Sequence, residues 1–227
     1  MLRDDTVVFQ FTGPMGVRVE IGQSIVFLLG FIVIFSGGDI VQSAIFAALL
    51  FLAIFLHELG HAWGCQVQRI PVRRIMLHGG GGFCERVRSA NAYQQELIVA
   101  MGPIVNLALW ALASLAQWAM LSSMTTVPSM MMIQIYMALN TFAFLNLAFF
   151  IFNLIPVQPL DGGKLLHLIL LRVLERDAAL RVAGRVGLVL SILWIPAAIV
   201  VYMDYGWILF FLPSIPAHYR MARGQLA

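Results

Sequence analysis

Apolar residues follow one another along this chain in runs long enough to form membrane-spanning helices. A helix that crosses the hydrocarbon core of a bilayer needs about 20 mostly apolar residues. A shorter final stretch is interrupted by Pro213 and completes a set of about six predicted segments. The segments are Ser24–Gly37 extended by its flanks, Val41–Gly64, Leu97–Leu121, Met130–Leu154, Val182–Met203 and the short Trp207–Ile215.

Two other regions show the alternating or turn-flanked runs that are typical of strands. Residues 6–21 contain two such runs around the turn Thr12–Gly16, which predicts a β-hairpin at the membrane surface. The runs Pro71–His78 and Phe83–Val87 flank four glycines, Gly79–Gly82, and predict a re-entrant β-loop. The chain is therefore expected to be a polytopic α-helical membrane protein with a small membrane-associated β-sheet.

Composition agrees with this fold class. Hydrophobic residues make up 61% of the 227 residues and charged residues 11%, with a mean hydropathy of +0.89. Water-soluble domains carry about a quarter charged residues. These values exclude a soluble enzyme, a disordered regulator and a nucleic-acid binder. The two cysteines are too few for a disulfide framework.

The positive charges predict how the chain is oriented. With six spans, all 14 Lys and Arg residues lie on one side, since none falls in the connections near residues 37–39, 121–129 or 204–206. The positive-inside rule makes that side cytoplasmic, together with both termini. We expect a bacterial or archaeal plasma membrane.

The absence of an internal repeat or a linker predicts one domain over residues 1–227. Its parts are expected in this order: 1–21, the hairpin; 22–65, two spans; 66–90, the β-loop; 92–154, two spans; 155–163, a loop; and 164–227, a cytoplasmic-side helix and the last two spans.

Ionisable residues cluster at the cytoplasmic end of the second span, in the sequence His57-Glu58-Leu59-Gly60-His61. Positions i and i+4 share a helix face, so His57 and His61 can bind one metal ion, with Glu58 beside it. The alternative is that both histidines are ordinary core residues. Burying two histidines and a carboxylate in an apolar run is costly, which favours a zinc site with Glu58 as general base.

A catalytic zinc site has a third protein ligand, and Asp161 is the candidate. The segment Asn153–Gly163 contains two prolines that end the fourth span and force extended backbone at membrane depth. Such backbone is tolerated where it lines a polar cavity. Alone, Asp161 is better explained as a turn residue or a helix N-cap. Paired with the two histidines, we interpret it as a ligand.

These motifs resemble the site-2 protease family of intramembrane zinc metalloproteases. The shared residues are the His57–His61 motif, Asn153-x-x-Pro156-x-x-x-Leu160-Asp161-Gly162, and Gly102-Pro103-x-x-Asn106. The resemblance implies one zinc ion held by His57, His61 and Asp161, with Glu58 as the catalytic base and with Asn106 and Asn153 lining the cleft. It implies hydrolysis within the transmembrane helix of a single-pass signalling protein in the lipid bilayer. The expected partners include an adaptor protein as an option but no nucleic acid. We expect a compact member without a PDZ-like or nucleotide-sensing domain.

Several assignments have competing explanations. An edge strand at Gly79–Gly82 would let an extended substrate add to the sheet, whereas a plain surface turn is the alternative. For Asn106 and Asn153 an oxyanion or substrate role and an interhelical hydrogen bond are equally favoured. We interpret His218 as an interfacial residue. A membrane ion or metal transporter and a non-catalytic scaffold are the rival functions, because intramembrane histidines and carboxylates also mark ion pathways.

Overall fold

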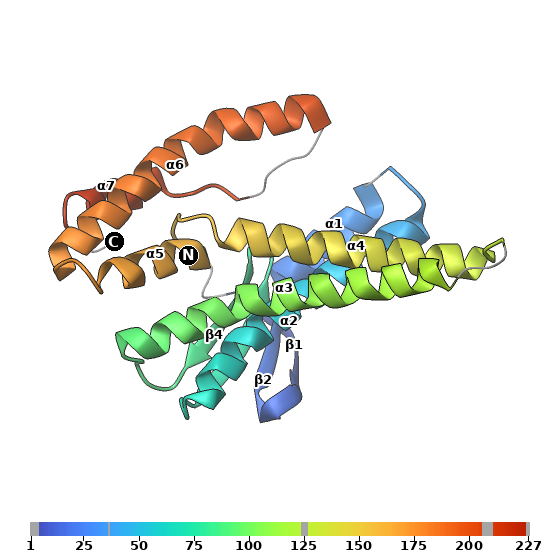
Figure 1. Cartoon of the computed structure of the whole chain (residues 1–227), viewed down its shortest axis with the longest axis horizontal. Coiled ribbons are helices and arrows are strands. Elements are labelled where there is room, and N and C mark those ends of the chain that lie inside the picture. The colour runs from blue at the N-terminus through green and yellow to red at the C-terminus, as the bar shows by residue number, and fades with distance from the viewer. Residues whose placement is uncertain (1–4, 36, 124–126, 206–210, 226–227) are drawn as a thin grey trace. The chain divides into compact units, whose positions relative to one another are not determined.

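Long apolar helices dominate the computed structural model, which describes residues 5–35, 37–123, 127–205 and 211–225. Among these residues four helices are long and apolar enough to cross a membrane. They are α2 (Ile40–Val67), α3 (Ala92–Ser122), α4 (Met130–Asn153) and α6 (Arg176–Tyr205) (Figure 1). The prediction of a multi-pass helical membrane protein is confirmed.

The first predicted span is shorter than the sequence pattern indicates. Helix α1 covers Gln23–Phe35, or 13 residues. At about 1.5 Å per residue it is too short to cross a hydrocarbon core of about 30 Å alone. The flanks do not lengthen it, because strand β2 (Arg18–Gly22) precedes it and the Asp39 side chain caps the next helix by accepting a hydrogen bond from Val41 N–H. The first part of the predicted sixth segment, residues 207–210, lies outside the described residues.

The described strands form one four-stranded sheet in the order β1-β2-β3-β4. Strands β1 (Val7–Thr12) and β2 (Arg18–Gly22) are the predicted antiparallel hairpin. Strands β3 (Val72–His78) and β4 (Gly81–Arg86) are the predicted β-loop, also antiparallel. Parallel pairing of β2 with β3 joins the two hairpins, with Val19 opposite Ile75.

The sheet is attached to α2 through an apolar core. Its buried members come from the hairpin, α1, α2 and β3, and strands β3 and β4 both contact α2. They are Val17, Val19, Ile25, Ile54, Ala62, Ile75 and Leu77. This packing places the glycine-rich turn and β4 directly against the helix that carries His57 and His61.

The chain divides into two compact units. One comprises Met1–Ala90 and Met101–Ile151, and contains the sheet, α1, α2, most of α3 and most of α4. In this unit α3 and α4 run side by side (Figure 1), joined by a hydrogen bond from Gln117 to Asn140. The other unit comprises Asn91–Ala100 and Phe152–Ala227. It contains α5 (Asp161–Leu170), α6 and α7 (Ile215–Ala222), and α7 packs against α6.

Candidate metal centre

His57 and His61 lie one turn apart on α2 and direct their rings to the same point. Their Nε2 atoms are 3.1 Å apart, and the two rings meet edge to face at 88°. Both side chains are buried, with exposed fractions of 6% and 8%. Two imidazole nitrogens that converge inside an apolar bundle form the kind of donor pair that binds a transition-metal ion.

A chain of buried amides orients the first of these rings. The Asn106 Oδ1 atom lies 2.5 Å from His57 Nδ1. As a carbonyl oxygen it can only accept, so His57 Nδ1–H donates this hydrogen bond. The assigned tautomer therefore leaves the lone pair of His57 on Nε2. Asn106 Nδ2 donates in turn to Asn146 Oδ1 at 2.8 Å, and Asn146 Nδ2 donates to the Phe142 carbonyl at 2.8 Å. Asn146 of α4 thus supports the His57 ring through Asn106, a role that its position in the sequence does not indicate.

Glycines keep open the space in front of the two rings. A Cβ atom on Gly102 of α3 would lie 2.5 Å from His61 Nε2 and 2.7 Å from His57 Nε2. A Cβ atom on Gly60 would lie 2.7 Å from the Met101 carbonyl oxygen, so α2 and α3 approach closely at this level. Small residues allow such close packing of membrane helices. The space in front of the two Nε2 atoms is open because residue 102 has no side chain.

Glu58 lies next to the two histidines and under strand β4. Its exposed fraction is 5%, and its Oε2 atom has no hydrogen-bond partner among the described residues. A Cβ atom on Gly82 would lie 2.6 Å from Glu58 Cγ and 3.0 Å from Oε1. A buried carboxylate oxygen without a protein partner is costly, so Glu58 is a candidate for a chemical role.

The glycine-rich turn is held in place by side chains from outside the β-loop. The Ser24 hydroxyl at the start of α1 accepts a hydrogen bond from Gly79 N–H at 2.8 Å and donates its own proton to the Asp5 carboxylate. His78 Nδ1 accepts from Gly80 N–H at 3.1 Å, and burial lowers the pKa of this imidazole. Gly81 has a φ of +119°, which only glycine adopts without strain.

Strand β4 is an edge of the sheet among the described residues. Its outer backbone groups are therefore not used by a neighbouring strand of that sheet. The Cys84 side chain of β4 meets Cys65 of α2, and this hydrogen bond, together with burial, raises the pKa of the Cys84 thiol. The sequence offered no sign of this contact, because the two cysteines are 19 positions apart.

Asp161 and Asn153 belong to the second unit. Asp161 is the first residue of α5, is 3% exposed, and pairs with Lys164 Nζ at 3.0 Å. It is not the N-cap, a position that Leu160 occupies. Gly162 and Gly163 allow the preceding loop to fold onto α5, because a Cβ atom on either would lie within 2.5 Å of loop backbone. Asn153 is the last residue of α4 and is partly buried.

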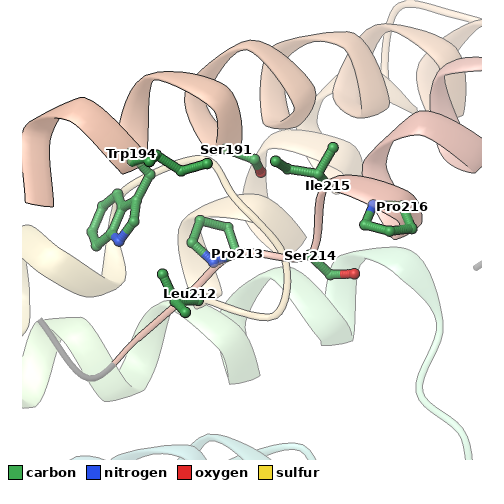
Figure 2. Close-up of a pocket in the computed structure, with 8 residues that line it drawn as sticks. Ser191, Trp194, Leu212, Pro213, Ser214, Ile215 and Pro216 are labelled. Atoms are coloured by element: carbon green, nitrogen blue, oxygen red, sulfur yellow. The ribbon is translucent and has the colours of Figure 1, made fainter.

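A separate hollow of about 260 Å³ lies in the second unit, between α6 and residues 212–216. Trp194, Leu212 and Pro213 surround it in Figure 2. The Ser191 hydroxyl, also in its lining, donates a hydrogen bond to the Gly187 carbonyl at 2.6 Å. None of the described residues that line it is ionisable. These lining residues therefore offer neither a general base nor a carboxylate or imidazole ligand.

Comparison with known proteins finds a family model that matches part of the chain, and several similar proteins. Residues 110–194 match the model of peptidase family M50, a range that includes Asp161 and starts after His57. The chain is 29% identical over 184 residues to zinc metalloprotease MJ0392 of Methanocaldococcus jannaschii, covering 79% of this chain and 50% of that protein. It is 34% identical over 143 residues to putative zinc metalloprotease sll0528 of Synechocystis, covering 62% and 35%. It is 29% identical over 166 residues to stage IV sporulation protein FB of Bacillus subtilis, covering 71% and 53%.

The fold has a counterpart among solved structures. The site-2 protease of Methanocaldococcus jannaschii matches with a TM-score of 0.63 at 22% identity, over 95% of this chain and 92% of that one. The chain spans about half or less of the length of the three curated relatives. Together the family match, the relatives and the fold confirm the resemblance that the motifs indicate: residues 110–194 are similar to peptidase family M50, and the chain has the fold of a site-2 protease.

Proposed function

We propose that this chain is an intramembrane zinc endopeptidase that hydrolyses a peptide bond in or near the transmembrane helix of a membrane-anchored protein. The observation that carries the proposal is the buried Glu58 carboxylate beside the converging Nε2 atoms of His57 and His61. Its Oε2 atom has no hydrogen-bond partner within the part of the chain that the structure describes. The names of two curated relatives as zinc metalloproteases support it.

His57, His61 and Asp161 are the proposed ligands of one zinc ion per chain, since each offers a suitable ligand atom. The donor set fits the metal: two neutral imidazoles, one of them oriented by Asn106, and one buried carboxylate. The glycine at position 102 leaves room for an ion in front of the rings. A bound zinc ion supplies Lewis acidity, which makes water a nucleophile near neutral pH.

Glu58 is the proposed general base and acid. Its carboxylate takes a proton from the attacking water as the water oxygen bonds to the substrate carbonyl carbon. It then passes that proton to the peptide nitrogen as the carbon–nitrogen bond breaks, so that one carboxyl and one amine product form. The low exposure of Glu58 strengthens its interaction with the developing charges, because little water is present to screen them.

The outer edge of β4 is the proposed place for the substrate. A helix shields its carbonyl groups by internal hydrogen bonds, so the substrate has to unwind locally before hydrolysis. An extended peptide that adds to β4 would place its backbone near Gly82, next to Glu58. Asn106 is occupied by His57 and Asn146, which favours support of the metal ligand over contact with substrate. Asn153 is the remaining amide proposed to line the cleft.

The proposed location is the plasma membrane, with residues 1–227 acting as one protease domain and with both termini and the active site on the cytoplasmic side. The distribution of the 14 Lys and Arg residues supports this orientation. Reporter fusions after Gly38, Ser123 and Ala227 test it. A cytoplasmic reporter that is active after Ala227 and inactive at the other two sites is expected, and the reverse pattern refutes the orientation.

The test of the proposed activity is a comparison of Glu58→Gln with Glu175→Gln in the detergent-purified chain. Glu175 is exposed and lies outside the candidate site, so the same chemical change there serves as the control. We expect Glu58→Gln to abolish cleavage of a single-pass reporter while zinc content stays near that of the wild type. Cleavage by Glu58→Gln at the wild-type rate would exclude Glu58 as the base. Absence of zinc from the folded wild type would exclude the metal centre.

A further inference from the structure

The second unit contains a buried histidine that the proposed chemistry does not use. His218 of α7 is 1% exposed, although its sequence position indicated an interfacial residue. It fits against α6 because that helix has glycines facing it. A Cβ atom on Gly187 would lie 2.1 Å from His218 Cδ2, and one on Gly184 would lie 2.3 Å from the backbone nitrogen of Ala222.

The hydrogen bonds around His218 assign its protonation state. Nδ1 lies 2.8 Å from the Ser214 carbonyl oxygen, which can only accept. Nδ1 also lies 3.2 Å from the Ser191 hydroxyl, whose own proton is directed to the Gly187 carbonyl. The proton of the imidazole is therefore on Nδ1, and Nε2 carries the lone pair.

That lone pair accepts a hydrogen bond from the loop before α5. The backbone N–H of Gln158 donates to His218 Nε2 at 3.0 Å, across 60 positions of sequence. The neighbouring amides of the loop have backbone acceptors: Val157 N–H donates to Ile155 and Leu160 N–H donates to Val157. His218 therefore completes the hydrogen bonding of this loop from outside it.

The anchored loop determines where Asp161 lies. Gln158 precedes Asp161 by three residues, and its backbone nitrogen would be 2.6 Å from a Cβ atom on Gly163, in the first turn of α5. Movement of Gln158 would therefore shift the first turn of that helix and the carboxylate that begins it. The N-cap of α5 has no side-chain hydrogen bond of its own to hold the turn.

We propose that His218 is a positioning residue for Asp161: by accepting the Gln158 N–H it holds the aspartate loop in the geometry needed to bind zinc. This inference rests on the proposed function, in which Asp161 is a zinc ligand. It gives the C-terminal helix α7 a role in metal affinity, although α7 contributes no ligand.

The test measures zinc affinity of the full chain in detergent, by competition with a chromophoric chelator, for variants that separate the two ring nitrogens. In His218→Gln the side-chain oxygen reaches the former Nε2 position and can accept from Gln158. In His218→Asn the amide is one carbon shorter and reaches only the Nδ1 position. We expect the Asn variant to bind zinc about tenfold or more weakly, in the range found for outer-shell residues, and the Gln variant to bind within about threefold of the wild type.

Two further variants support the comparison. Gly187→Ala retains His218 but pushes the imidazole from its place, and it should weaken zinc binding as His218→Asn does. Ser191→Ala alters only the Nδ1 side and should bind zinc like the wild type. Circular dichroism and thermal unfolding of the metal-free proteins identify any variant that is not folded. If His218→Asn is not folded, the difference between Gly187→Ala and Ser191→Ala decides the question.

Asp161→Ala separates failure of this inference from failure of the proposed ligand set. If Asp161→Ala weakens zinc binding and folded His218→Asn does not, the positioning role is refuted while the ligand set stands. Equal losses in His218→Gln and His218→Asn also refute it, since the retained acceptor would then have no effect. If Asp161→Ala binds zinc as the wild type does, the ligand set itself is wrong and this inference fails with it.

Discussion

Replacing Gly82 by alanine should slow catalysis strongly without removing the metal. The new Cβ atom would lie 2.6 Å from Glu58 Cγ and 3.0 Å from both Cδ and Oε1. Favourable carbon–carbon contacts are at about 3.5–4.0 Å, so the carboxylate or the strand must move by about 1 Å. The three atoms nearest to the new methyl group all belong to Glu58, and neither His57 nor His61 is among them.

The magnitude follows from the sensitivity of proton transfer to position. A displacement of about 1 Å at a catalytic group can cost about a hundredfold in rate, or about 2.7 kcal/mol in activation free energy. Gly82→Ala should therefore lower the cleavage rate of a single-pass reporter about a hundredfold. Its zinc content should equal that of the wild type.

The assay compares cleavage in detergent or proteoliposomes with zinc measured on the same preparation. Gly30→Ala is the control, because a Cβ atom there meets no atom within 4 Å. It should leave both quantities unchanged. A folded Gly82→Ala variant that cleaves as fast as wild type would show that β4 does not constrain Glu58, and the proposed placement of substrate on that strand would lose its support.

Three other changes have defined outcomes. Gly102→Ala should lose both zinc and activity, because the new Cβ atom would lie 2.7 Å from His57 Nε2. A Gly102→Ala variant with full zinc content would contradict an ion at this position. Asn106→Leu should weaken zinc binding about 10–100-fold by releasing the His57 ring. The control Asn140→Leu, at an exposed position, should leave zinc affinity unchanged. Equal zinc affinities of the two variants, measured by chelator competition, would refute the supporting role of Asn106. Burial lowers the pKa of His78 in the folded protein below the value of about 6.5 that it has in the unfolded chain. Between these two pKa values the unfolded chain binds more protons, so stability should fall as the pH drops through this range. The thermal midpoint of wild type should fall more between pH 7.5 and 5.5 than that of His78→Asn, and parallel curves would refute it.

The sequence alone determined the parts of this protein that depend on local periodicity. The bilayer requires apolar runs of a given length, so the hydropathy pattern by itself locates α2, α3, α4 and α6. The helical period placed His57 and His61 on one face, and alternation with glycine-rich turns located both hairpins. Asp161 could be predicted as a ligand only together with His57 and His61, because a catalytic zinc site has a third protein ligand.

Only the tertiary structure decided how distant segments meet. The parallel pairing of β2 with β3 brings the hairpin beside the β-loop, and with it Ser24 to the glycine turn. The closeness of Gly82 to Glu58, and the use of Asn146 to hold Asn106, likewise join residues 24 and 40 positions apart. The residues next to a glycine or an asparagine in the sequence do not indicate which distant residue it will contact.

His218 shows the physical reason most clearly. Its neighbours in sequence place it near the end of the chain, in a short amphipathic helix, and indicate an interface. Its function depends on the backbone N–H of Gln158 and on the absence of a side chain at Gly187, both far away along the chain. Local patterns determine which elements form and which face is apolar, whereas hydrogen bonds across 60 residues exist only after those elements have packed.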